Sequence, residues 1–453
     1  MSKPYYTVVS LFSGAMGLDI GLKSTGRFKL LACVEKEKVF CDTIRANVQN
    51  GNLPPKLVIF EGDIKGLTPD DLMKRLGLKP GELDLLVGGP PCQSFSTAGK
   101  RGTVQDSRGT LIWDYLRFVK AIQPKYFIME NVRGLLSAAT KHRPIAERPE
   151  LGGARLQFEE KPGSVVRAFA EELRNDSGNP YHLDVFEVNA VNYGAPQLRE
   201  RVLFIGNRYN RVVDFPNPTH GAGADTAHLE DQLDFLQKSA PLQSWRTLGE
   251  ALSGLQETNP VLVNFSPRKK RYLSLVPQGG NWRCLPVPLQ KESMGKAWHA
   301  KGGRSGWWRR LSFDLPCPTL VTLPNHASTA LCHPTEVRAL TVREYARIQE
   351  FPDNWLFVGK PGQQYTQIGN AVPTRLGKIA GETVARHLDK TRATGWQSES
   401  SAPREYRVIY IQSHVRTRQW FKGGKVFVPS EDLTQPSVAY PRTKTLRRTR
   451  LLA

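Results

Sequence analysis

The side chain best suited to chemistry in this sequence is the thiol of Cys92. Apolar residues 85–87 are followed by Gly-Gly-Pro-Pro at 88–91, and these residues cannot continue a strand. The sequence therefore predicts a strand that ends in a rigid turn presenting a thiol. Ligands of open α/β sheets bind beyond the carboxyl ends of the strands, where a thiolate is a strong nucleophile. The alternative is a buried structural cysteine, a common fate of this residue type.

Charged side chains stand beside two further predicted strands. Apolar residues 127–129 lead to Glu130 and Asn131, and Arg199 and Arg201 precede another apolar run. An acid and a guanidinium at one sheet edge can stabilise charge that develops on a bound ring. The alternatives are a structural salt bridge for Glu130 and a surface pair for the arginines.

Together these motifs resemble those of the DNA cytosine-5 methyltransferase family, of the bacterial or phage restriction-modification type. Pro-Cys-Gln (91–93), Glu-Asn-Val (130–132) and Gln-x-Arg-x-Arg (197–201) occur in the family's order, and the resemblance covers residues 5–210 and 335–390. It implies an α/β, Rossmann-like S-adenosylmethionine-dependent methyltransferase fold with a smaller, irregular target-recognition domain. The implied reaction transfers a methyl group to carbon 5 of a cytosine flipped out of a specific short double-stranded DNA sequence.

The resemblance also implies a role for each catalytic residue. Cys92 adds covalently to carbon 6 of the cytosine, which makes carbon 5 nucleophilic. Glu130, if protonated, donates to ring nitrogen 3, and Arg201 binds the carbonyl oxygen. Arg199 is expected on a phosphate, and Asn131 shapes the pocket. The implied catalytic residues are Cys92, Gln93, Glu130, Asn131, Arg199 and Arg201.

The cofactor site is expected at three strand ends and one returning segment. A strand at 6–12 leads into a glycine-containing turn and a helix, and two later strands end near Glu35 and Asp63. Two solvated acids at loop starts are the alternative for this pair. In the resembled family these places hold S-adenosylmethionine, together with segment 367–373. The implied cofactor-binding residues are Phe12, Ser13, Gly14, Gly17, Leu18, Glu35, Asp63, Ile64, Pro91, Asn370 and Val372.

The composition favours a polyanionic partner. Lys and Arg number 63 against 42 Asp and Glu, a formal net charge of +21, and neutralising phosphates releases counterions. Basic residues interleaved with Gly and Trp in residues 207–334 suit loops that follow a phosphate backbone. An ordinary basic surface is the alternative. The predicted DNA-binding residues are Ser96, Lys100, Arg283, Arg304, Arg309, Arg310 and Thr319.

Four segments are expected along the chain. Residues 1–206 form the first part of the catalytic, cofactor-binding domain, and residues 207–334 form the target-recognition domain. Residues 335–395 supply a bracing helix and a final helix that folds back against the first. Residues 396–453 are a basic extension of unknown role, in which 408–411 and 425–428 can pair as strands.

The remaining features concern location and partners. Six cysteines without C-x-x-C spacing indicate neither a zinc site nor a disulfide framework, so we expect no metal and a reducing cytoplasm, bacterial or phage-infected. No stretch predicts a membrane span or a signal peptide. We expect a monomer whose cognate restriction endonuclease is linked to it functionally rather than physically. A tRNA methyltransferase and an inactive DNA-binding protein on the same scaffold remain alternatives.

Overall fold

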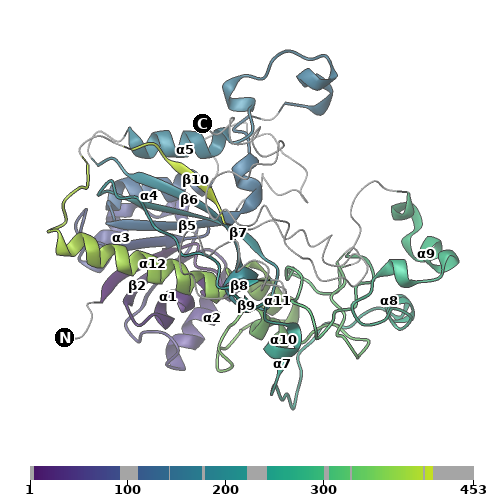
Figure 1. Ribbon diagram of the computed structural model, residues 1–453. Helices are drawn as coiled ribbons and strands as arrows, with labels where there is room; N and C mark the ends of the chain where they lie inside the picture. Colours follow the sequence, from purple (N-terminus) through teal and green to yellow (C-terminus); the bar gives the residue numbers. More distant parts are fainter. Residues whose placement is uncertain are drawn as a thin grey trace.

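The protein is built on one eight-stranded sheet, shown in Figure 1. The computed structural model describes residues 5–91, 111–141, 143–175, 179–221, 242–299, 306–326, 329–400 and 404–411. The strand order is β10-β6-β7-β5-β4-β1-β2-β3. The strands are β1 (Tyr6–Leu11), β2 (Phe28–Glu35), β3 (Val58–Glu61), β4 (Leu85–Gly88), β5 (Tyr126–Val132), β6 (His182–Asn189), β7 (Glu200–Asn207) and β10 (Arg407–Tyr410).

The direction of β7 distinguishes this sheet from a fully parallel one. Strands β1 to β5 pair in parallel, whereas β7 is antiparallel to both of its neighbours, β5 and β6. The chain order reverses at β1, which has β2 on one side and β4 on the other. Such a switch point opens a crevice at the carboxyl ends of the strands. The α/β, Rossmann-like fold predicted from the sequence is confirmed.

Helices cover both faces of the sheet (Figure 1). Helices α3, α4 and α5 lie on one face, and α1 and α12 lie on the other. The helices of this domain and its return segment are α1 (Gly17–Ser24), α2 (Lys38–Gln49), α3 (Pro69–Leu76), α4 (Leu111–Ile122), α5 (Ser164–Arg174), α10 (Val342–Ile348), α11 (Pro361–Asn370) and α12 (Thr374–Ala393).

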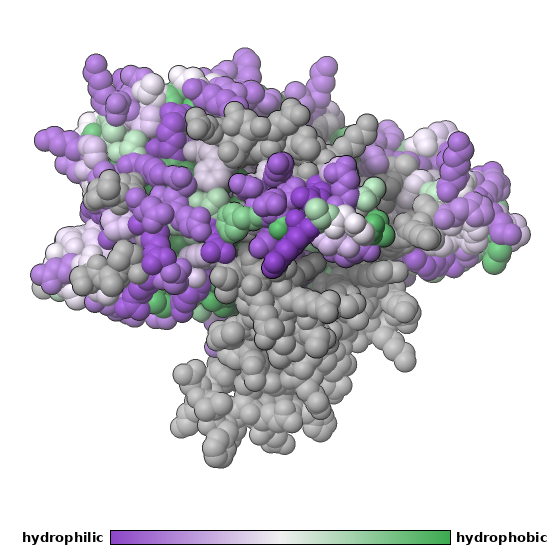
Figure 2. All heavy atoms as spheres, turned by 90° about the horizontal axis from the view of Figure 1, so that it is seen from above, coloured by the Kyte–Doolittle hydropathy of each residue, from purple (hydrophilic) through white to green (hydrophobic). Residues whose placement is uncertain are grey.

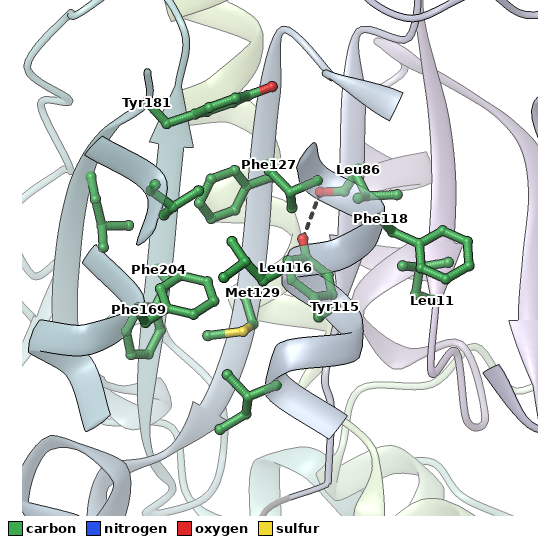
Figure 3. Packing of buried hydrophobic residues seen from close by; sticks show 14 of the residues in the cluster. Leu11, Leu86, Tyr115, Leu116, Phe118, Phe127, Met129, Phe169, Tyr181 and Phe204 are labelled. Atoms are coloured by element: carbon green, nitrogen blue, oxygen red, sulfur yellow. Dashed lines mark hydrogen bonds between the residues drawn. The ribbon is translucent and has the colours of Figure 1, made fainter. Parts of the chain in front are cut away.

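The core beneath α4 is rich in aromatic rings (Figure 3). Phe127 on β5 packs against Phe169 of α5 and Tyr115 of α4, with ring centroids 6.4 and 6.1 Å apart. The Tyr115 hydroxyl donates to the Leu86 carbonyl over 3.1 Å, so this buried polar group is satisfied. β4 and the first part of β5 are buried on both faces, which explains the apolar runs at 85–87 and 126–129.

The final helix, α12, packs directly on α1, as the sequence predicts. The contact depends on glycines, because a Cβ on Gly21 would lie 2.2 Å from the Thr374 carbonyl oxygen. From the other side, a Cβ on Gly377 would lie 2.4 Å from the Leu18 carbonyl oxygen. The two helices, far apart in the sequence, therefore touch through their backbones and close the catalytic domain.

The segment between β7 and α10 departs from the α/β pattern, as expected. It contains β8 (His220–Gly221), β9 (Gln243–Ser244), α7 (Leu248–Leu252), α8 (Pro267–Leu273) and α9 (Val287–Met294). Its own apolar cluster includes Tyr272, Trp282 and Trp308. In Figure 1, α8 and α9 project away from the sheet. Part of this region therefore packs around its own cluster, whereas Leu248, Leu311 and Leu320 join the core cluster of α1 and α10.

The C-terminal extension begins as part of the catalytic sheet. β10 pairs in parallel with β6, and Arg407 Nε lies 2.6 Å from Oδ1 of the fully buried Asp184. Residues 425–428, predicted to pair with 408–411, lie outside the described residues. The guanidinium supplies the counter-charge that a buried carboxylate requires.

The molecular surface is mainly polar on the face shown in Figure 2, where the described apolar residues form only small separate patches. In the part of the chain that the structure describes, no helix is sufficiently long and apolar to cross a membrane.

The close α1–α12 contact leads to a test by added side-chain volume. Gly21→Ala is expected to lower the free energy of unfolding by about 2 kcal/mol or more, because the backbone of α12 cannot yield easily. Gly362→Ala is the matched helical control, since its Cβ would meet only Leu323 Cδ2, at 3.8 Å. Urea unfolding of both variants measures the difference. Equal stability of the two variants would contradict the backbone contact.

Candidate active site

Glu130 and Arg201 form an ion pair at the carboxyl edge of the sheet. They lie on β5 and β7, whose register pairs Glu130 with Leu203 and Val132 with Arg201, and diagonal neighbours share one face of a sheet. Arg201 Nε lies 2.6 Å from Glu130 Oε1, and the two side chains are only 12% and 11% exposed. A ring held here would meet a carboxyl group and a guanidinium side by side.

The turn after β4 passes close to this ion pair. A Cβ on Gly89 would lie 3.2 Å from Glu130 Oε2, so a glycine lets the main chain approach the carboxylate. Asn131 Nδ2 donates to the Pro90 carbonyl over 3.0 Å. Asn131 therefore fixes the turn that leads toward the predicted nucleophile.

A second cluster of charged side chains, Arg133, Glu187 and Glu200, lies next to Arg201. Arg133 forms ion pairs with Glu187 and, over 3.3 Å, with Glu200. Burial raises the pKa of Glu200 to about 7, although the nearby Arg133 lowers it. The carbonyl of Glu200 accepts from Arg201 Nη1 over 2.7 Å. This cluster could not be predicted from the sequence, because the chemistry of the motifs requires none of its three members.

Arg199 occupies a different environment from Arg201. Its side chain is buried, and its guanidinium donates to the carbonyls of Leu320, Gly369 and Ala371 over 2.7–3.0 Å. Burial lowers its pKa well below the usual range. This placement contradicts the expected phosphate contact, since the guanidinium would have to leave three carbonyls to reach a phosphate.

Glu35, at the end of β2, organises the loop after β1. Its Oε2 accepts from the Gly14 N–H over 2.7 Å and its Oε1 from the Glu37 N–H over 2.9 Å. Burial raises the pKa of Glu35, while these main-chain hydrogen bonds lower it. The Ser13 hydroxyl donates to the Ser10 carbonyl over 3.1 Å, and Phe12 has φ +53°. The carboxylate of Glu35 therefore holds the predicted cofactor loop in place.

The third strand end carries Asp63 and Ile64. Asp63 accepts from the Lys65 N–H over 3.0 Å and lies 3.0 Å from Lys36 Nζ, and both interactions lower its pKa. Lys36 thus pairs with the acid at this edge. Ile64 is buried in the core.

The return segment meets the N-terminal loop at Gly17. A Cβ on Gly17 would lie 2.2 Å from the Val372 carbonyl oxygen, and Leu18 and Val372 belong to one apolar cluster. Asn370 is exposed at the end of α11. The structure therefore brings together the two distant parts of the predicted cofactor site.

Asp19 is a buried acid that the motif analysis missed. It lies on α1 below the cofactor loop, one carboxylate oxygen has no hydrogen-bond partner, and the carboxyl group bonds to Ser10. Burial raises its pKa to about 7. The only signal in the sequence is that Asp19 stands among the apolar residues of α1. The structure shows that these neighbours are buried.

The predicted DNA contacts fall into different environments. Arg310 is buried and donates to main-chain carbonyls, which contradicts its predicted DNA contact; the acceptors are those of Leu273, Val276, Pro334 and Thr335. Arg283 is exposed, with its guanidinium 4.5 Å from the Trp282 ring centroid. Arg309 is half-buried, and burial lowers its pKa to about 10. Thr319 is exposed and donates to the Leu198 carbonyl over 2.6 Å.

The predicted residues not yet discussed are Pro91 and five positions outside the described part of the chain. Pro91 is described and exposed. The remaining predictions, at Cys92, Gln93, Ser96, Lys100 and Arg304, lie outside the described residues.

Comparison with known proteins identifies the family. The sequence matches the model of the C-5 cytosine-specific DNA methylase family over residues 6–386. The chain belongs to this family. It is a DNA (cytosine-5-)-methyltransferase, and the family's methyl donor is S-adenosylmethionine.

Curated relatives of this methylase are similar over most of their length. Type II methyltransferase M.PspPI of Psychrobacter sp. (strain TA137) is 38% identical, over 85% of this chain and 80% of its own. M.Sau96I of Staphylococcus aureus is 36% identical, over 85% and 77%. M.Eco47II of Escherichia coli is 35% identical, over 86% and 81%.

Solved structures share the methylase's fold. One, described as a DNA modification methyltransferase encoded within a prophage (E. coli), gives a TM-score of 0.53 at 22% identity, over 85% of this chain and 99% of that chain. The Dnmt2 methyltransferase of S. pombe gives 0.50 at 14% identity, over 86% and 99%.

The residues of the methylase fit the family's cofactor. Nothing lies within 4 Å of a Cβ built on Gly14, so space is open above the loop. The carboxylate of Glu35 stands at this place, where an acid can accept hydrogen bonds from ribose hydroxyls.

The raised pKa of Asp19 predicts a pH dependence of stability. A folded-state pKa raised from 3.8 to about 7 means that the folded protein holds this proton more tightly. The stability it contributes is present below pH 4 and is lost as the pH rises to 7. Asp19→Asn is therefore expected to raise the free energy of unfolding at pH 8 by as much as about 4 kcal/mol.

Urea unfolding between pH 4 and pH 8 measures this difference. At pH 4 the variant and the wild type are expected to be similar in stability. Asp70→Asn, at an exposed position of α3, is the matched control and should leave the pH profile unchanged. A parallel pH profile for Asp19→Asn and the wild type would disprove the assignment.

Proposed function

We propose that this methylase modifies carbon 5 of a cytosine flipped out of a specific short double-stranded DNA sequence, through a covalent Cys92 adduct at carbon 6. The observation that carries the proposal is the Glu130–Arg201 ion pair, 2.6 Å long. Two residues with the required chemistry stand together beside the turn that leads to Cys92. A flipped base is needed because carbon 6 is inaccessible in a stacked duplex.

The chemistry begins on the ring. The Cys92 thiolate forms a bond to carbon 6, and the electrons of the 5,6 double bond move toward nitrogen 3 and the carbonyl oxygen. In its protonated form Glu130 donates a proton to nitrogen 3, and Arg201 stabilises the oxygen. Both groups already lie within reach of one another, so a single ring can meet both.

The remaining steps restore the aromatic ring. When bound, S-adenosylmethionine would supply an electrophilic methyl group to carbon 5, with its sulfur as the leaving group. A base then removes the carbon 5 proton, the electron pair expels the Cys92 thiolate, and nitrogen 3 returns its proton to Glu130. Glu35, Asp63 and Asn370 would hold the cofactor, and Asn131 keeps the turn before Cys92 in place.

The DNA surface of the proposed complex includes exposed residues of the smaller unit. Arg283 and Thr319 are exposed, and Arg309 is half-buried. Ser96, Lys100 and Arg304 are proposed contacts from the sequence alone. Arg199 and Arg310 are excluded from this surface, because their guanidinium groups are committed to main-chain carbonyls.

The biological role we propose is protection of DNA from a cognate restriction endonuclease. The three curated relatives are named Type II methyltransferases. We propose that the enzyme acts as a monomer in the cytoplasm of a bacterial or phage-infected cell, with no physical link to the endonuclease. The polar character of the face in Figure 2 agrees with a monomer.

Bisulfite sequencing tests the reaction and its specificity together. Plasmid DNA from cells expressing the wild type is expected to show protected cytosines in one short motif. DNA from cells expressing Cys92→Ala is expected to show complete conversion. Methyl incorporation into tRNA but not into duplex DNA would overturn the proposed substrate, and methylation by Cys92→Ala would overturn the covalent step.

Glu130→Gln tests the role of the ion pair. Loss of the proton donor is expected to lower kcat by about 10²- to 10⁴-fold, with the affinity for the cofactor nearly unchanged. Glu150→Gln, at an exposed position, is the matched control and should keep wild-type activity. Tritiated methyl incorporation into target DNA measures both variants. Wild-type turnover by Glu130→Gln would remove Glu130 from the mechanism.

A further inference from the structure

Arg199 is a fully buried cation whose guanidinium donates to three main-chain carbonyls. Nη1 donates to Leu320 over 3.0 Å, and Nη2 donates to Gly369 over 2.7 Å and to Ala371 over 3.0 Å. The side chain is among the largest fully buried ones in the described residues. An isolated buried charge is expensive, so an arginine here requires an explanation beyond packing.

The three carbonyls belong to two segments with different tasks. Leu320 follows Thr319 within segment 207–334, the expected target-recognition domain. Gly369 and Ala371 flank Asn370, at the end of α11 beside the proposed cofactor site. We define the Arg199 clamp as the guanidinium of Arg199 together with the carbonyls of Leu320, Gly369 and Ala371.

The segments held by the clamp also touch directly. A Cβ on Gly369 would lie 2.5 Å from the Val321 carbonyl oxygen, so the two backbones are in contact. A movement of either segment therefore presses on the other.

A second buried side chain reinforces the same place. Gln349, at the end of α10, donates to the Ile368 and Ala371 carbonyls over 2.8 and 3.0 Å. Its Oε1 accepts from Gln197 Nε2 over 2.6 Å. Both glutamines are fully buried. The Ala371 carbonyl thus accepts from Arg199 and from Gln349, which fixes the position of the return segment.

Three side chains at alternate positions lead into β7 and contact two different parts of the molecule. They are Gln197, Arg199 and Arg201. Arg199 holds the return segment directly and Gln197 does so through Gln349, whereas Arg201 pairs with Glu130 in the active site. One short stretch of chain therefore connects the reacting groups, the exit of the recognition unit and the cofactor side.

We propose that Arg199 is a positioning residue that couples DNA binding to cofactor binding. The clamp keeps Thr319, on the DNA side, and Asn370, on the cofactor side, in one arrangement. DNA that fixes the first segment therefore favours the cofactor-binding position of the second. Thermodynamic linkage requires the reverse effect to be equal. This inference rests on the proposed function.

The test measures coupling rather than activity. Calorimetry gives the Kd of S-adenosylhomocysteine, a non-reactive probe, with and without a duplex carrying the motif found by bisulfite sequencing. For the wild type the duplex is expected to tighten binding about 5- to 150-fold. For Arg199→Lys, which keeps the charge but not the planar fork of donors, the ratio is expected to fall below about 3-fold.

Two further variants make the result specific. Arg201→Lys is the neighbouring control, expected to lose turnover and to keep the wild-type ratio. Gln349→Met removes the other side chain that donates to Ala371, and it is expected to lower the ratio as well. It provides the test should Arg199→Lys fail to fold, as judged by thermal unfolding.

The outcomes separate this inference from the proposed function. A wild-type enzyme that methylates DNA but shows no coupling, or folded Arg199 and Gln349 variants that keep the full ratio, would overturn the coupling role alone. A wild-type enzyme that does not methylate duplex DNA would overturn the proposed function and this inference with it.

Discussion

The reversed direction of β7 is the constraint on which the active site depends. A strand that runs parallel to β5 would bring its end to the carboxyl edge of the sheet, but an antiparallel strand brings its beginning there. The residues just before and at the start of β7 therefore arrive beside the ends of β4 and β5. This single reversal places Arg201 against Glu130 and directs Arg199 toward the return segment.

The sequence predicts most of the sheet and the positions of its acids. Strands such as β4 and β5 are buried on both faces, so their sequences are continuously apolar and end abruptly at polar or turn-forming residues. Glu35 and Glu130 stand at or near such strand ends, so both acids were expected at the edge of the sheet. The return of α12 to α1 was expected from the family resemblance, whereas the glycines that let the two backbones touch are seen only in the structure.

Other features could not be predicted, because the charge of a side chain does not indicate which group that side chain will contact. Arg310 and Arg199 read as DNA-facing residues in a basic chain, yet both are buried among main-chain carbonyls. Every residue type has a main-chain carbonyl, so the sequence does not show which carbonyls will accept these hydrogen bonds. Asp19 and Glu200 are similar, since only tertiary packing removes them from water and raises their pKa values to about 7.

β10 lies beyond residue 386, where the match to the family model ends. It covers the outer edge of β6, and Arg407 neutralises the buried carboxylate of Asp184. A shortened enzyme ending with the family's common region would leave a row of unpaired backbone groups and an uncompensated buried charge. Open sheet edges of this kind pair with other chains. The extension therefore adds a strand to the sheet and a counter-charge to its core, although the family match does not include it.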